Sequence, residues 1–146
     1  MIKMVEIRVL DGSHLYYEEP KHSDHPILLI NLTGYYQDRS IPKISSTVLM
    51  HRYDGILGLV FADTIITNDD RVFTRGNAKL IRQIVNSREW KSIWVACDQG
   101  ISRSPAVAIA LDEHLNKKKS DLIKQYPCYN PYVYGILSKE LSKGGK

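Results

Sequence analysis

Three short, uninterrupted apolar runs constrain the fold of this chain more than any other feature. They occupy residues 26–31, 55–61 and 92–96, and each is bounded by polar residues. Strands that are covered on both faces have this pattern, and such strands are typical of parallel sheets with helices on either side. We therefore predict three buried strands in one sheet, with residues 26–31 and 55–61 in central positions.

A fourth predicted strand has a different pattern. Residues 4–10 alternate in polarity, with Val5, Ile7 and Val9 on one face and charged residues on the other. This alternation is typical of a strand with one face exposed to solvent. Residues 4–10 are therefore predicted to form an edge strand.

Further segments show helical patterns. Residues 75–87 have one apolar face and are predicted to pack on the sheet, whereas residues 105–115 are apolar on nearly every side and are predicted to be enclosed. Residues 121–126 are a candidate short helix. Asn130-Pro131 opens the last helix, with Asn as the N-cap and Pro in the first helical position.

The alternation of strands and helices predicts a layered α/β domain with a mostly parallel central sheet flanked by helices. The chain has 146 residues, the length of one domain, so residues 1–146 are assigned to a single domain. In such sheets the ligand site lies beyond the carboxyl ends of the strands. This rule points to the residues that follow Ala96.

The composition is that of an ordinary globular protein with a formal net charge of +4. Residues 117–146 hold the basic excess, with seven lysines against Asp121 and Glu140. The lysines at 117–119 would suit nucleic acid or an acidic partner, but a solvated turn is the expected interpretation, and nucleic acid is not an expected partner. No apolar run is long enough to span a membrane, and the first residues do not resemble a secretion signal. We therefore expect a monomeric, cytoplasmic protein without membrane contact.

The segment between the third buried strand and the enclosed helix is a candidate phosphate-binding loop. It reads Cys97-Asp98-Gln99-Gly100-Ile101-Ser102-Arg103-Ser104. Five residues between the cysteine and the arginine allow the loop to curl around one tetrahedral anion, with backbone N–H groups pointing inward. Gly100 permits a left-handed backbone and a close approach. The helix that follows adds unpaired donors and its dipole.

Cys97 and Arg103 are the candidate reactive pair of this loop. The positive potential that would bind phosphate also favours the thiolate of Cys97, which is the nucleophilic form of cysteine. The planar guanidinium of Arg103 suits two phosphate oxygens at once. We therefore predict that Cys97 attacks a phosphate held by Arg103.

The segment VACDQGISRSPAVAIAL resembles the signature of the cysteine-dependent protein tyrosine phosphatases, and with GISRS and this chain length it is most similar to their compact dual-specificity branch. The resemblance implies that Cys97 forms a phosphocysteine, that Arg103 clamps the phosphate, and that the Ser104 hydroxyl hydrogen-bonds to the sulfur and eases its departure. It also implies that the loop binds the substrate through Asp98, Gln99, Gly100, Ile101, Ser102 and Arg103. The strand order, the helix before the loop and the Asn130-Pro131 helix extend the resemblance over most of the chain.

The same resemblance implies an aspartate general acid on a loop that precedes the cysteine. Asp63 lies 34 residues before Cys97 and follows the apolar run that ends at Phe61. It would therefore lie at the same carboxyl edge of the sheet as Cys97. Asp69 and Asp70, in a polar turn further along the chain, are the competing candidates.

Ala96 departs from the family pattern, which usually has histidine immediately before the cysteine. That histidine helps to organise the loop and to keep the thiol acidic, so we expect weakened rather than abolished activity. Asp98 adds negative charge and the loop contains no lysine, which disfavours polyanionic substrates.

The predicted activity is hydrolysis of phosphotyrosine in proteins, with phosphoserine and phosphothreonine as further candidate substrates, through a phosphocysteine intermediate. Two alternatives stay open: a catalytically weakened module that binds phosphate or phosphopeptides, and a phosphatase acting on RNA 5′ ends or small phosphorylated metabolites. No metal or other cofactor is expected, because the histidines form no metal-binding pattern. Cys128 is interpreted as a packing thiol, with redox pairing to Cys97 as the alternative. Either Tyr35 or Tyr36 is a candidate for the pocket lining.

Overall fold

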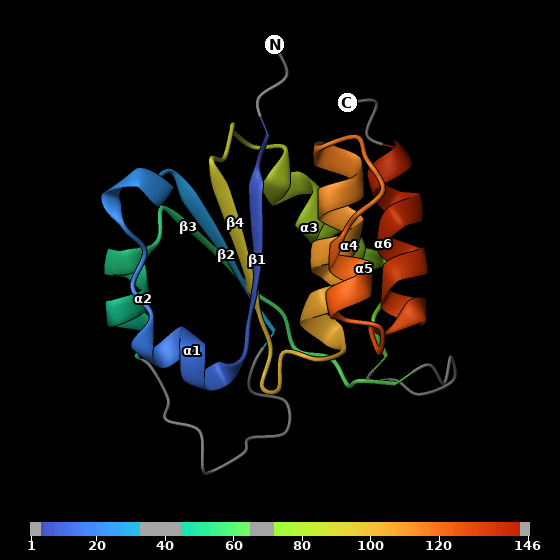
Figure 1. Cartoon of the computed structure of the whole chain (residues 1–146), viewed down its shortest axis with the longest axis horizontal. Helices are drawn as coiled ribbons and strands as arrows, with labels where there is room; N and C mark the ends of the chain where they lie inside the picture. Colours follow the sequence, from blue (N-terminus) through green and yellow to red (C-terminus); the bar gives the residue numbers. More distant parts are fainter. Residues whose placement is uncertain (1–3, 33–44, 65–71, 144–146) are drawn as a thin grey trace.

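The sheet of this protein consists of parallel strands only. The computed structural model describes residues 4–32, 45–64 and 72–143. The strands are β1 (Glu6–Leu10), β2 (Ile27–Asn31), β3 (Gly55–Gly58) and β4 (Ser92–Ala96), in the spatial order β1-β4-β2-β3. Each neighbouring pair is parallel, and helices lie on both sides of the sheet (Figure 1). The predicted layered α/β fold is confirmed.

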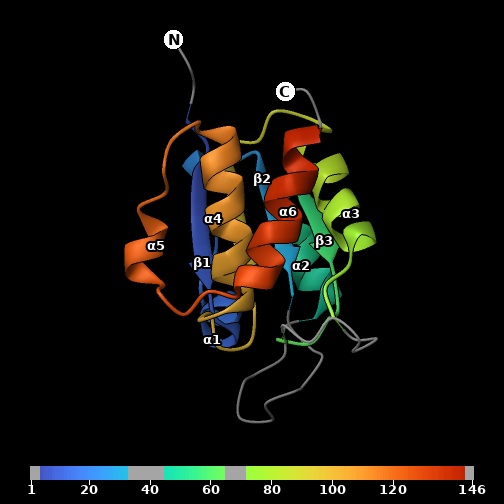
Figure 2. The same ribbon diagram turned by 90° about the vertical axis from the view of Figure 1, so that its right-hand side faces the viewer.

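Two groups of helices enclose the sheet. On one side lie α1 (Gly12–Tyr17) and α2 (Ser46–Arg52), and a short 3-10 turn at His22–Asp24 leads into β2. The other side is covered by α3 (Arg75–Val85), α4 (Arg103–Leu115), α5 (Leu122–Gln125) and α6 (Pro131–Lys143). Within this second group α6 packs against both α3 and α4 (Figure 2).

β2 and β4 are buried between the two groups of helices. All residues of β4 and the first four of β2 are buried. Leu28 and Ile30 face the core shared with α4 and α6, whereas Ile27 and Leu29 face the core on the α1 and α2 side. The predictions of a central strand at residues 26–31 and of a buried strand at residues 92–96 are confirmed.

α4 is enclosed over most of its length. Every residue from Arg103 to Asp112 is buried, and the helix packs against β1, β4 and α6. The prediction of an enclosed helix at residues 105–115 is confirmed. The helix begins two residues earlier than predicted because the loop after β4 turns directly into it.

The prediction for residues 55–61 is wrong in two respects. β3 ends at Gly58, and it is an edge strand rather than a central one. Leu59 and Phe61 are buried because the chain packs them into the core as it leaves the sheet. The apolar run therefore reflects a buried connection beyond the strand and not a strand covered on both faces.

β1 forms the opposite edge of the sheet, as predicted for residues 4–10. Val5, Ile7 and Val9 are partly buried against the core on the α4 side. The alternation of the sequence therefore identified both the position of this strand and its buried face.

The amphipathic helix predicted at residues 75–87 is α3. It buries Ala78, Ile81 and Val85, as predicted, but Leu80 is 46% exposed. The helix ends at Val85, where Asn86 is the C-cap.

The two C-terminal helices lie where the sequence predicts them. The candidate at residues 121–126 is α5. α6 begins at Pro131, and Asn130 Oδ1 accepts hydrogen bonds from the backbone N–H groups of Tyr132 at 3.0 Å and Val133 at 3.1 Å. Across the described part of the chain, the helices are too short or too polar to span a bilayer.

Gly55→Ala should destabilise the protein, because the sheet has no room for a methyl group at this position. A Cβ atom at residue 55 would lie 2.6 Å from the tip of the Trp90 ring and 3.3 Å from Leu28 Cδ1. We expect the free energy of unfolding in urea to fall by about 1–3 kcal/mol, the usual cost of overpacking. Gly58→Ala is the matched control, because nothing lies within 4 Å of a Cβ atom there. Similar losses in the two variants would contradict this explanation.

Candidate active site

The segment that follows β4 is tied to the end of β1 before it enters α4. Cys97 N–H donates to Leu10 O at 3.2 Å, and Gly12 N–H donates to Asp98 O at 3.0 Å. The chain then turns, and α4 begins at Arg103. The loop between β4 and α4 therefore lies at the carboxyl edge of the sheet, the edge to which the sequence points.

The Cys97 sulfur lies inside this loop. It is buried, and Ser104 Oγ lies 3.0 Å from it within hydrogen-bond distance. Gly100 N–H donates to the same sulfur at 3.2 Å. Donors directed at the sulfur stabilise negative charge on it. The contact predicted between Ser104 and Cys97 is therefore present in the structure.

Gly100 adopts the left-handed backbone conformation predicted for it, with φ of +67°. A Cβ atom at this position would lie 3.1 Å from Asp11 N and 3.2 Å from Asp11 Cβ. Glycine is thus favoured both by the backbone conformation and by the close approach of the chain after β1. This conformation directs the Gly100 N–H toward Cys97.

Asp11 adds a negative charge on the β1 side of the loop. Its Oδ1 accepts a hydrogen bond from His14 N–H at 2.7 Å and lies 2.8 Å from His14 Nδ1. Burial acts to raise the pKa of Asp11, but these hydrogen bonds outweigh burial, and the pKa lies below its usual value. Asp11 therefore adds to the acidic charge that Asp98 contributes to the loop.

The Arg103 side chain is buried and anchored on one side. Its Nη1 donates to Phe61 O at 3.1 Å, and its Nη2 lies 3.7 Å from Asp98 Oδ2 in a long ion pair. Asp98 Oδ2 is itself buried without a hydrogen-bond partner among the described residues. Because a guanidinium has five N–H donors, these two contacts leave donors for a bound anion.

Asp63 lies at the rim of the loop, where two side chains hold it. Its Oδ1 accepts hydrogen bonds from Ser102 Oγ at 2.8 Å and from Asn130 Nδ2 at 2.9 Å. Asn130 also donates its backbone N–H to Ser102 O at 3.0 Å and its Nδ2 to Thr64 O at 3.2 Å. The structure therefore brings Asp63 to the loop that contains Cys97, and the residue stays exposed to solvent.

Sequence reasoning identified Asn130 only as a helix cap. Its Oδ1 caps α6 while its Nδ2 binds Asp63, so one side chain links the start of α6 to the connection after β3. The Asn-Pro pair predicts the cap. No local pattern predicts the second contact, because it joins segments that lie far apart in the sequence.

Ala96 is fully buried on the α1 and α2 side of the sheet. It belongs to an apolar cluster with Leu10, Leu29, Trp94 and others. Histidine at this position would have to place a polar ring in that cluster, which is costly unless the ring finds a hydrogen-bond partner. The side chain at position 96 therefore packs in the core and does not point into the loop around Cys97.

Asp69 and Asp70, and likewise Tyr35 and Tyr36, lie outside the described residues. Cys128 is exposed and Cys97 is buried, and both thiols are free. Within the described part of the chain, no three His, Cys, Asp or Glu side chains come together as a metal site.

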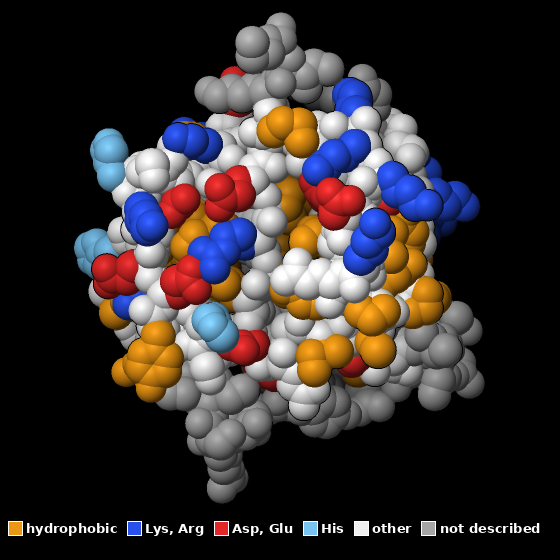
Figure 3. All heavy atoms as spheres, viewed as in Figure 1, with side chains coloured by type: hydrophobic (Ala, Val, Ile, Leu, Met, Phe, Trp, Pro, Cys, Tyr) orange, Lys and Arg blue, Asp and Glu red, His pale blue; other side chains and the backbone are white. Residues whose placement is uncertain are grey.

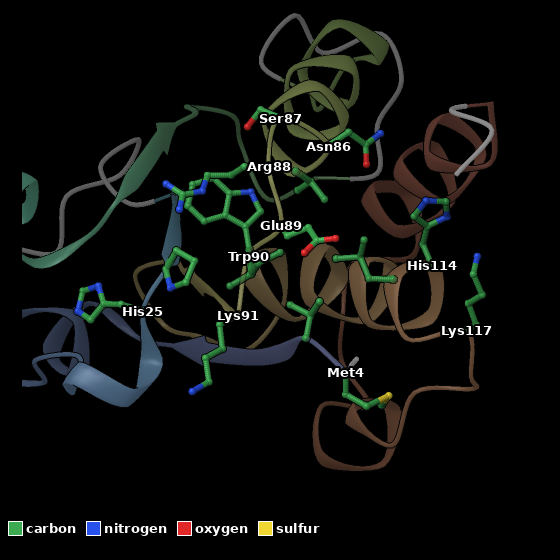
Figure 4. A pocket seen from close by; sticks show the side chains of 15 residues that line it. Met4, His25, Asn86, Ser87, Arg88, Glu89, Trp90, Lys91, His114 and Lys117 are labelled. Carbon is green, nitrogen blue, oxygen red and sulfur yellow. The ribbon is translucent and has the colours of Figure 1, made fainter. Parts of the chain in front are cut away.

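One hollow lies along β1 and another at the amino edge of the sheet. One of about 440 Å³ is lined by β1 together with Gln99 and Gly100 of the loop. Another, of about 990 Å³, lies at the amino edge of the sheet, where Arg88 and Trp90 precede β4 and His114 lies near the end of α4 (Figure 4). Its lining includes no residue of the loop around Cys97. The larger hollow is therefore separate from the candidate active site.

The sequence matches no protein-family model, and no curated protein matches it. The arrangement of side chains at the carboxyl edge of the sheet is therefore the basis for a functional proposal.

Proposed function

We propose that this chain is a phosphomonoesterase that hydrolyses phosphotyrosine in proteins, together with phosphoserine and phosphothreonine, through a phosphocysteine intermediate and without a metal cofactor. The observation that carries the proposal is the meeting of three groups at one edge of the sheet. They are the Cys97 sulfur with its donors, the Arg103 guanidinium and the Asp63 carboxyl group. A nucleophile, an anion clamp and a proton donor are the groups that cleavage of a phosphate ester requires. A cytoplasmic location, where thiols stay reduced, suits this chemistry.

In the first step the Cys97 thiolate attacks the phosphorus atom. The S–P bond forms while the bond from phosphorus to the ester oxygen breaks, and the Asp63 carboxylic acid gives its proton to the departing oxygen. Phe61 O fixes the position of the Arg103 guanidinium. The remaining N–H groups of the guanidinium then hold the phosphate oxygens. Fixed donors of this kind stabilise the charge of the transition state without reorganising during the reaction.

In the second step water attacks the phosphocysteine. Asp63, now a carboxylate, accepts a proton from the water, the S–P bond breaks, and inorganic phosphate leaves. The electron pair of the broken bond returns to sulfur. Ser104 Oγ and the Gly100 N–H both lie within hydrogen-bond distance of that sulfur and would stabilise the departing thiolate.

Ser102 connects the acid to the loop. Its hydroxyl donates to Asp63, and its backbone carbonyl accepts from the N–H of Asn130. Because Arg103 follows Ser102 directly, the proton donor and the phosphate clamp are held by neighbouring residues. This linkage holds the Asp63 carboxyl group beside the loop, where a general acid would have to lie.

The alternative of a phosphate-binding module has one specific observation in its favour. Ala96 stands where the phosphatases that the loop resembles usually have histidine, so the imidazole that would keep the thiol acidic is missing. A binding module would retain the loop and Arg103 but turn over no substrate.

Hydrolysis of an aryl phosphate by the wild-type chain and by Cys97→Ser tests the proposal. We expect turnover by the wild type that a chelator does not abolish, and none by the variant, because an alcohol is a far weaker nucleophile than a thiolate at neutral pH. Vanadate should still bind the variant, since the loop and Arg103 are unchanged. Undiminished turnover by Cys97→Ser would refute the mechanism, and phosphate binding without turnover by the wild type would favour the binding module.

Asp63→Asn tests the general acid. The substituted amide oxygen can still accept the hydrogen bonds from Ser102 and Asn130, so the loop should keep its structure. We expect hydrolysis of phosphotyrosine to slow by about 10²–10⁴-fold, the usual contribution of a general acid. The defect should shrink with nitrophenyl phosphate, because nitrophenol is a better leaving group and needs less protonation.

Asp69→Asn and Asp70→Asn are the controls for this assignment, and kcat/KM with both substrates is the measurement. Neither control variant should change the rate appreciably. A larger defect in either of them, or an Asp63→Asn defect that is equal for the two leaving groups, would assign the general acid to another residue.

A further inference from the structure

β1 has an open edge. It pairs with β4 on one side and with no other strand of the described sheet. Glu6 N–H donates to Lys91 O, and Leu10 O accepts from Cys97 N–H, so both residues direct their backbone groups toward β4. Successive residues of a strand direct these groups to opposite edges. Ile7 and Val9 therefore direct their N–H and C=O groups outward, where no described residue bonds to them.

Asn116 closes the amino end of this edge. Its Nδ2 donates to Val5 O at 2.9 Å, and its Oδ1 accepts from Val5 N–H at 2.8 Å. The side-chain amide thus pairs with Val5 as the backbone of a neighbouring strand would. The same kind of pairing is open at Ile7 and Val9, the next two residues with outward-facing groups.

A hollow of about 440 Å³ runs along the open edge to the candidate active site. Residues 7–11 form one wall, and Leu122, Gln125 and Tyr126 from the α5 region form another. Gln99 and Gly100 also line it, and the Gly100 N–H donates to Cys97 Sγ. The open backbone groups are therefore continuous with the loop that contains the nucleophile.

Basic residues lie at the far end of this edge. Residues 117–119 are three exposed lysines, and they follow the Asn116 that pairs with Val5. Figure 3, which has β1 at the front, shows Lys and Arg side chains on both sides of the strand, several of them on the side where α4, α5 and α6 lie. β1 has five residues, so an extended peptide that runs from the loop along β1 reaches the lysines after about five residues.

We infer that the open edge of β1 binds the extended segment that flanks the phosphorylated residue of a protein substrate, as an added strand with acidic residues opposite Lys117–Lys119. This inference rests on the proposed function and specifies its substrate class. An extended peptide backbone presents N–H and C=O groups at the same spacing as the free groups of β1. Hydrogen bonds between such groups are the basis of recognition by strand addition. The lysines then favour peptides whose residues at the end away from the phosphorylated residue are acidic.

Phosphotyrosine peptides with a single N-methylated amide test the added strand. The peptides carry acidic residues about five positions from the phosphotyrosine, on its amino side in one set and on its carboxyl side in the other. In a peptide that adds to the sheet as a strand, only every second amide faces β1. We expect methylation at those alternate positions to lower kcat/KM about fivefold, the value of one backbone hydrogen bond, and methylation at the intervening positions to have little effect. A uniform effect, or none, would overturn the inference.

Charge-reversal variants test the basic end. Lys118→Glu should lower kcat/KM for the acidic peptide about threefold or more, through the loss of attraction and the added repulsion, and leave hydrolysis of nitrophenyl phosphate unchanged. Lys79→Glu, at a lysine on α3 that is also exposed, is the matched control and should change neither rate. Equal effects of the two variants on the peptide would refute the role of Lys117–Lys119.

Amide hydrogen exchange separates this inference from the proposed function. The acidic peptide without phosphate, at high concentration, should slow exchange at Ile7 and Val9 even if the chain turns over no aryl phosphate. Turnover of aryl phosphate without such protection would refute the added strand and leave the phosphatase proposal intact. A second copy of the chain is the competing occupant of the edge. Exchange at Ile7 and Val9 would then slow as the protein concentration rises without peptide, and sedimentation would show a dimer. That result would overturn the inference.

Discussion

β4 is buried along its whole length because it pairs with a strand on each side and carries a packed core on each face, and the candidate site depends on this burial. Ile93, Trp94 and Val95 are almost inaccessible to solvent, and full burial of an Ile or Val side chain contributes about 1.5–3 kcal/mol to folding. Cys97 is the first residue beyond the strand, and its N–H still pairs with Leu10. The sheet therefore holds the start of the loop that contains the sulfur, and the enclosed α4 holds the other end.

The remaining parts of the site come from connections that the parallel sheet brings to the same edge. The chain after β3 supplies Phe61 O for the arginine and Asp63 for the loop. The chain before α6 supplies Asn130, which binds both Asp63 and the backbone of Ser102. Asn130 caps α6 and also positions Asp63, so the stability of this helix and the geometry of the site depend on the same side chain. The site is therefore a junction of three connections rather than a single loop.

Local patterns in the sequence predicted much of this arrangement. The apolar runs identified β2 and β4, the alternation identified β1 as an edge, and the cysteine-to-arginine spacing with Gly100 identified the loop and its left-handed residue. The same reasoning misplaced β3, because a run of apolar residues does not reveal whether they pack within a sheet or in the connection after it. It also missed the second contact of Asn130 and the anchoring of Arg103 by Phe61 O, since both join distant segments through single hydrogen bonds.

The central claim is that Cys97 carries the phosphoryl group between the two chemical steps. Rapid acid quenching during turnover of an aryl phosphate, followed by peptide mass spectrometry, tests this claim most directly. The account predicts one added phosphoryl group on the peptide that contains Cys97, attached to sulfur and lost on treatment that cleaves S–P bonds. Turnover with no trapped phosphoenzyme under conditions where the second step is slow, or a phosphoryl group on any other residue, would contradict it.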